Sequence, residues 1–129
     1  MQPSVQPTLR VHIQNKGKVD YPLSDLIYLQ AVGNYSWLQW HSGQRMLMPR
    51  ALAYYRTQLP GQSFLRLHRK CLVNRHYIDR IERRGNDQGG FLYLRSGEVL
   101  PISRRRWVEI SQLLSGHKSC QAIDSVRIC

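Results

Sequence analysis

Apolar and polar residues alternate over short segments through most of this chain. In LRVHI, residues 9–13, the apolar side chains of Leu9, Val11 and Ile13 fall on one side of the backbone. A period of two is typical of a β-strand with one buried face. This alternation, or enrichment in aromatic and β-branched residues, predicts strands at 9–13, 25–31, 35–41, 45–48, 64–68, 76–82, 91–95 and 98–102.

Turn-forming residues separate many of the predicted strands. The clusters VGN, SGQ, RGNDQGG and SG fall at 32–34, 42–44, 84–90 and 96–97. Glycine and asparagine readily adopt the backbone conformations that tight turns need. Short strands joined by such turns predict antiparallel hairpins.

Two segments have the spacing of a helix instead. The segment 50–59 follows Pro49, ends at the Pro-Gly pair 60–61, and carries an apolar stripe of Leu52, Tyr55 and Leu59. The segment 104–115 has one apolar face, formed by Trp107, Ile110 and Leu114. The sequence therefore predicts a mainly β fold with one or two short helices.

The chain length and its patterning predict one domain. At 129 residues the chain can bury a core without disulfides or a metal. Residues 1–8 contain two prolines and predict a flexible lead-in, 9–115 carry the patterned domain, and 116–129 predict a loosely ordered tail. No segment is long and apolar enough to span a membrane, and none resembles a secretory signal, so we expect a cytoplasmic protein without a membrane partner.

The charge balance points to nucleic acid. The formal net charge is +11, and arginine outnumbers lysine by 15 to 4. Arginine contacts phosphate and guanine through two parallel hydrogen bonds, whereas lysine supplies mainly a point charge. A strongly basic, arginine-rich chain therefore favours a nucleic-acid partner.

No catalytic or cofactor site is indicated. The eight acidic residues are scattered, and no Gly-rich phosphate loop or metal-ligand spacing is present. The three cysteines, Cys71, Cys120 and Cys129, are widely spaced and predict reduced thiols that serve packing. We therefore expect that the protein is not an enzyme and binds no cofactor. The alternative is a nuclease that uses His41, His68 or His76, to which no motif points.

A first candidate binding segment is FLRLHRKCLVN, residues 64–74. Arg66 and His68 share one face of the predicted strand, and the alternation then breaks, which predicts a turn presenting Arg69 and Lys70. Cations on an edge strand also discourage aggregation, and a lone histidine is more often structural than a ligand. Taken alone, this segment fits a solvated edge as well as a DNA contact.

A second candidate is SRRRW, residues 103–107. If Ser103 caps the helix, Arg104, Arg105 and Arg106 occupy its first turn. Cations are unfavourable at that end of a helix, so three in a row favour a bound phosphate over side chains that merely extend into water.

A third candidate is the predicted hairpin tip GNYSW, residues 33–37. Asn34, Tyr35 and Ser36 carry groups that contact bases or phosphates. A turn without any binding role explains this cluster equally well.

These segments resemble LytTR-type DNA-binding domains. FLRLHRKCLVN at 64–74 and LPISRRR at 100–106 are similar to two signatures of that family, and DLIYLQAVGNY at 25–35 is similar to its opening hairpin. The order and spacing agree over about residues 9–114. The chain departs from the family at Lys70 and Cys71, where a small serine and an aromatic residue are common.

The resemblance implies an elongated fold of small antiparallel sheets with a short helix, used by bacterial transcription regulators of the response-regulator type. It implies loops that enter successive major grooves of double-stranded DNA, with base-reading positions at Ser36, Arg69 and Arg105. The expected targets are promoter sites. These sites could contain paired repeats, and the protein could bind them as a dimer. Members often carry an upstream receiver domain, for which the eight-residue lead-in leaves no room, so either a stand-alone protein or a fragment of a larger regulator is expected.

The complete set of expected DNA-binding residues is Asn34, Tyr35, Ser36, Arg66, His68, Arg69, Lys70, Ser103, Arg104, Arg105 and Arg106. The alternative function is a small β-rich module for RNA or single strands. That function requires exposed aromatic rings along a strand face.

Overall fold

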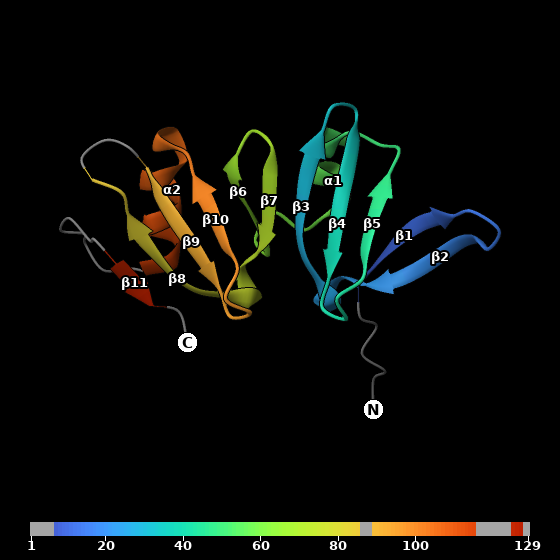
Figure 1. The fold of residues 1–129 in the computed structure, drawn as a ribbon, viewed down its shortest axis with the longest axis horizontal. Helices are drawn as coiled ribbons and strands as arrows, with labels where there is room; N and C mark the ends of the chain where they lie inside the picture. The colour runs from blue at the N-terminus through green and yellow to red at the C-terminus, as the bar shows by residue number, and fades with distance from the viewer. Residues whose placement is uncertain (1–6, 86–88, 116–124, 128–129) are drawn as a thin grey trace. The chain divides into compact units, whose positions relative to one another are not determined.

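The computed structural model describes residues 7–85, 89–115 and 125–127. The single domain expected from the chain length is built as two compact units, Met1–Pro60 and Gly61–Cys129. Antiparallel strands dominate both units, and each contains one α-helix in its described part (Figure 1). The predicted mainly β fold class with short helices is therefore confirmed.

The first unit begins with a hairpin of two strands, β1 (Thr8–Ile13) and β2 (Gly17–Pro22). They pair in continuous register from Thr8↔Pro22 to Ile13↔Gly17. Leu9 and Val11 are buried. The prediction missed β2, because Val19 and Tyr21 are the only large apolar residues in GKVDYP before its proline.

Three further strands of the first unit pair side by side in the order β5-β4-β3. They are β3 (Leu26–Val32), β4 (Tyr35–Trp40) and β5 (Arg45–Met48), and a 3-10 turn, η1 (Leu23–Asp25), precedes β3. The predicted helix is α1 (Leu52–Gln58). The core of this unit includes the buried side chains of Leu26, Leu29, Leu38, Trp40, Leu52 and Tyr55.

The second unit begins with a hairpin of β6 (Phe64–His68) and β7 (Cys71–Asn74). All four side chains of β7 are buried, which explains why alternation did not reveal this strand. A 3-10 turn, η2 (Arg75–Tyr77), follows β7. The side chain of Asn74 caps it by accepting a hydrogen bond from the His76 backbone N–H.

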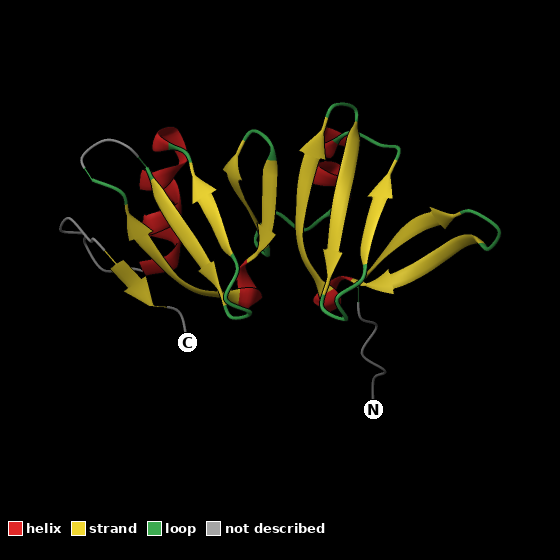
Figure 2. Cartoon of the chain, in the orientation of Figure 1, coloured by secondary structure: helices red, strands yellow, loops and turns green. Residues whose placement is uncertain are grey.

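The remaining strands of the second unit are β8 (Ile78–Arg83), β9 (Gly90–Leu94), β10 (Val99–Ile102) and β11 (Ser125–Arg127), in the order β10-β9-β8-β11. Helix α2 (Arg104–Ser115) packs on one side of these strands (Figure 2). Gly90 allows the close contact, because a Cβ at this position would overlap the ring of Trp107. Trp107 and Ile110 are both buried.

Strand β11 lies in the segment expected to be a loosely ordered tail. It pairs with β8 through Val126↔Ile81 and the flanking residues. Three residues without a visible period form a strand here because β8 offers a free edge. The other residues of the expected tail, 116–124 and 128–129, lie outside the described residues, as do residues 1–6 of the expected lead-in.

Candidate nucleic-acid interface

The turn between β6 and β7 is held together by its own side chains. The guanidinium of Arg66 donates to the backbone carbonyl oxygens of His68 (Nε, 3.1 Å) and Arg69 (a terminal nitrogen, 2.6 Å). Arg66 is half-buried. Its side chain therefore stabilises the turn from within instead of pointing away from it.

His68 contributes a second contact inside this turn. Its Nδ1 accepts a hydrogen bond from the backbone N–H of Lys70 at 3.2 Å. Burial, and then the charges of Arg66, Lys70 and Arg69, lower the pKa of His68. The ring is accordingly neutral at neutral pH, which keeps Nδ1 available as an acceptor.

With Arg66 and His68 engaged in the turn, Arg69 and Lys70 are left at its tip. Both are exposed. Neither side chain forms an ion pair with a residue in the described part of the chain. The predicted turn with two outward cations is therefore present.

The start of α2 is capped as the sequence predicted. The hydroxyl of Ser103 accepts a hydrogen bond from the Arg106 backbone N–H at 3.2 Å. The Ser103 carbonyl accepts from the N–H of Trp107 at 3.0 Å. Gly89 passes close to this junction, because a Cβ there would overlap the backbone of Ile102 and Arg104.

One backbone hydrogen bond joins these two candidate segments. The N–H of Ser103 donates to the carbonyl oxygen of Leu67 at 3.0 Å. Leu67 directly precedes His68, so the first turn of α2 starts beside the β6–β7 turn, and Figure 1 shows both at the same end of the unit. The structure thus brings together two clusters that lie far apart in the sequence.

The three arginines after Ser103 are not equivalent. Arg104 and Arg105 are exposed and form no ion pair with the residues that the structure describes. Arg106 instead pairs with Glu109, one turn along the helix, at 3.0 Å. Of the three arginines expected to favour a bound phosphate, two therefore have no ion pair within the described residues.

The hairpin tip of the first unit has two exposed candidates and one buried one. Val32 pairs with Tyr35 across a two-residue turn in which Gly33 has φ 60°. Asn34 is exposed, and Tyr35 is 49% exposed.

Ser36 does not reach the surface. It is 0% exposed, and its hydroxyl donates to the Arg50 carbonyl oxygen at 2.8 Å. The physical reason is the strand alternation, which puts Ser36 on the buried face of β4 with Leu38 and Trp40. In this structure the Ser36 hydroxyl bonds β4 to the segment before α1, and the side chain is not exposed at the hairpin tip.

Comparison with protein-family models identifies the family of this chain. The model of the LytTr DNA-binding domain matches residues 16–115. The chain belongs to the LytTR DNA-binding domain family. The resemblance seen in the sequence is confirmed, and the domain is a DNA-binding one.

A solved structure of a LytTr DNA-binding domain from Bacillus cereus has the same fold. It superposes with a TM-score of 0.71 at 22% identity, covering 87% of this chain and 100% of that one. A comparison with curated proteins gives no match.

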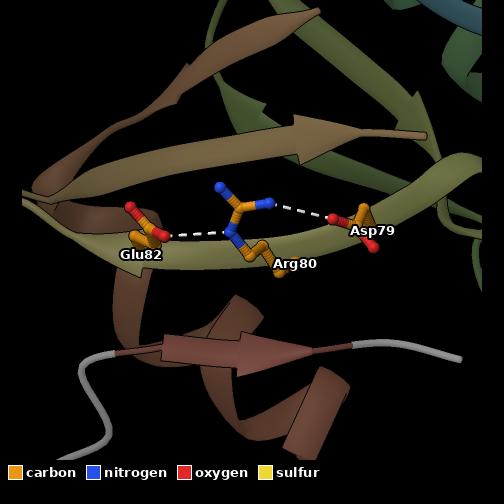
Figure 3. Close-up of polar contacts among 3 residues, drawn as sticks. All are labelled: Asp79, Arg80 and Glu82. Atoms are coloured by element: carbon orange, nitrogen blue, oxygen red, sulfur yellow. Dashed lines mark hydrogen bonds and ion pairs between the residues drawn. The ribbon is translucent and has the colours of Figure 1, made fainter. Parts of the chain in front are cut away.

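Arg80 of this LytTR domain is neutralised by two neighbouring carboxylates. Arg80 contacts both Asp79 and Glu82 at 2.9 Å (Figure 3). It also lies 4.0 Å from the centre of the Tyr93 ring. The hydrogen bond from Arg80 lowers the pKa of Glu82. Arg80 therefore stabilises the β8–β9 pair, and its charge is not available to a ligand.

Two arginines near the end of β8 were left out of the predicted site. Arg83 and Arg84 lie over the rings of Trp107 and Phe91, at 5.9 Å and 5.6 Å from the ring centres. Two consecutive arginines directly after the predicted strand 76–82 were a signal for them, but their aromatic partners could not be read from it.

Cys71 is suited to packing, as expected. It is buried, and burial followed by the charge of Glu98 raises the pKa of its thiol to about 12. Within the described residues, no group of histidines, cysteines and carboxylates could hold a metal ion. No helix of this part of the chain is long and apolar enough to cross a membrane.

Proposed function

We propose that this chain binds double-stranded DNA sequence-specifically and regulates transcription, with loops that enter successive major grooves. The proposed contact residues are Asn34, Tyr35, Arg69, Lys70, Arg104 and Arg105. Ser36 is not among them, because it is buried and hydrogen-bonded. Arg66, His68 and Ser103 have positioning roles, since each bonds to the backbone of a proposed contact loop or helix.

The observation that carries this proposal is the cluster around the Ser103–Leu67 hydrogen bond. The bond joins two exposed segments that together present Arg69, Lys70, Arg104 and Arg105. Arg10, Arg80 and Arg106 are matched by carboxylates, whereas these four cations form no ion pair with the described residues. A cluster left without counterions is the electrostatic pattern of a phosphate-binding surface.

Within this cluster the arginines have separate tasks. We propose that Arg69, at the tip of the turn, and Arg105, in the first turn of α2, read base edges in the major groove. Guanine accepts two hydrogen bonds from one guanidinium, which gives sequence discrimination. Arg104 and Lys70 bind phosphates, which position the domain but carry no sequence information.

The structure offers little support for the alternative of single-strand or RNA binding by stacked bases. The rings of Tyr28, Trp40 and Tyr55 are buried. Three more have an arginine over the ring: Arg45 over Trp37, Arg50 over Tyr54 and Arg80 over Tyr93. Stacking a base on those ring faces would first displace the arginine.

The test is a titration of labelled duplex DNA, single-stranded DNA and RNA, each with magnesium and with a chelator. A site selected from a random-sequence duplex library supplies the cognate DNA. We expect the tightest binding to the selected duplex, without any effect of the chelator. Equal affinity for single strands or RNA would contradict the proposal. The stoichiometry on the selected site also tests the expected dimer on paired repeats, because it shows whether one or two copies of the protein bind.

A further inference from the structure

A groove runs along β1 in the first unit, and none of the proposed DNA-contact residues lines it. One part of it has a volume of about 520 Å³, lined by every residue from Thr8 to His12 and, opposite, by residues of β5 and α1. A second hollow of about 400 Å³ shares His12, Met48 and Pro49 with the first and continues to Gln14. The two hollows together extend along the whole of β1.

The groove faces the edge of β1. Alternate side chains of a strand point to opposite faces, so a hollow lined by every consecutive residue lies along the strand's edge. In the part of the chain that the structure describes, β1 pairs with β2 alone, and β5 is likewise an end strand. An end strand leaves half of its backbone N–H and C=O groups without a strand partner.

This edge has the length and the regular register that strand addition needs. Natural edge strands are often very short, bulged, charged or interrupted by proline. β1 has six residues without proline, its register with β2 has no bulge, and the charge of its arginine, Arg10, is paired with Asp20. A strand of this length takes an extended partner of about six residues, at about 3.3 Å per residue.

The groove is cationic over an apolar floor. Arg10, His12, Lys18 and Arg50 line it, with Asp20 as the one acidic residue of the lining. Asp20 is already engaged by Arg10 through two hydrogen bonds of 2.9 and 3.3 Å. Lys18 and Arg50 have no ion-pair partner among the described residues. Leu9, Val11, Met48 and Tyr55 supply the buried apolar surface.

We propose that this groove binds an extended acidic peptide segment of another protein, which adds to β1 as a third strand. Backbone hydrogen bonds to β1 supply the affinity in this mode of recognition. The acidic side chains of the peptide meet Lys18 and Arg50, while its apolar side chains face Leu9 and Val11. The inference is independent of DNA binding, since the proposed DNA contacts are other residues.

The probe is a fluorescent eight-residue peptide that alternates valine and glutamate. Two companions are a valine–lysine peptide and the valine–glutamate peptide methylated on every backbone nitrogen, which removes its donors. Binding is followed by fluorescence anisotropy, and the edge itself by amide hydrogen exchange. The protein variants are Lys18→Glu with Arg50→Glu in the groove, and Lys16→Glu with Arg95→Glu, an equal charge change outside its lining.

We expect the valine–glutamate peptide to bind about tenfold more tightly than the valine–lysine peptide, because like charges oppose association. The groove variant should lose about the same factor, whereas the control variant keeps its affinity. Exchange should slow at alternate amides of β1, and the methylated peptide should not bind. Unchanged exchange in β1 at saturating peptide, or equal binding of the methylated peptide, would overturn the proposal. The proposal would also be overturned if duplex DNA slowed exchange in β1 and bound the groove variant more weakly than the wild type. The groove would then be a DNA-binding surface.

Discussion

The backbone N–H of Ser103 donates to the carbonyl oxygen of Leu67 at 3.0 Å, and this bond joins the cap of α2 to the end of β6, next to the β6–β7 turn. Each partner is itself fixed. Leu67 is 0% exposed, and Ser103 caps the helix through its hydroxyl. The backbone segments that carry the exposed arginines on either side are therefore held in a defined mutual position. Such preorganisation lowers the entropy cost of binding a rigid partner such as duplex DNA.

Removing the cap of α2 should destabilise the domain. Ser103→Ala deletes the acceptor for the Arg106 N–H, and loss of an N-cap costs about 1 kcal/mol of unfolding free energy. The control is Ser111→Ala, since the Ser111 hydroxyl bonds to the Val108 carbonyl within the same helix and caps no helix end. Urea unfolding measures both. If the two variants are equally stable, Ser103 does not act as a cap.

Charge reversal in α2 should separate Arg104 and Arg105 from Arg106. Arg104→Glu or Arg105→Glu replaces a cation at the helix N-terminus by a favourable anion, which adds about 0.3–1 kcal/mol. Arg106→Glu also breaks the pair with Glu109 and sets two carboxylates one turn apart, effects of about 0.2–0.5 kcal/mol each that cancel the gain. Thermal melting without DNA measures the difference. Equal stabilisation by all three changes would show that the Glu109 pair contributes nothing.

Loss of either proposed base reader should lower specificity more than general affinity. Arg69→Ala and Arg105→Ala should each cost about 1–3 kcal/mol on the selected duplex. Binding to random duplex should fall much less. Anisotropy titrations on both duplexes provide the comparison. Equal losses on the selected and the random duplex would assign these arginines to phosphate contacts instead.

Acid should weaken the β6–β7 turn through His68. Its pKa in the folded state lies below the ordinary 6.5, so the unfolded chain binds the proton more readily. The contribution of neutral His68 is therefore complete above about pH 6.5 and is lost as the pH falls below that value. His68→Asn keeps an acceptor near the position of Nδ1 and does not titrate. The wild type should lose more thermal stability than His68→Asn between about pH 7.5 and about pH 5. Equal losses would exclude a role for His68 protonation.

The sequence predicted those parts of the fold whose signals are local. The alternation in FLRLH and the cap at Ser103 were enough to predict β6 and the start of α2. Strand β7 was missed, because CLVN is buried on both faces and does not alternate. Strand β11 was missed, because it depends on the edge of β8 and not on its own sequence.

The same distinction applies to the candidate site. Clustered charge and turn chemistry predicted exposed cations at Arg69 and Arg105, and the spacing of Arg106 and Glu109 would have revealed their pair. The inward turn of Ser36 depends on which face of β4 is covered, and the Ser103–Leu67 bond joins segments that are distant in sequence. Packing decides both, so neither could be read from the local pattern.

The most direct test of the cluster at Ser103–Leu67 is the salt dependence of duplex binding. The variants are Arg104→Ala and, as a matched control, Arg95→Ala, an exposed arginine in the turn between β9 and β10 at the other end of those strands (Figure 1). Each contact between a cation and a phosphate contributes about one to the slope of log affinity against log salt. We predict that Arg104→Ala weakens binding to all duplexes and lowers this slope by about one, while Arg95→Ala changes neither. An unchanged slope for Arg104→Ala, or an equal fall for Arg95→Ala, would show that the cluster is not the DNA-binding surface.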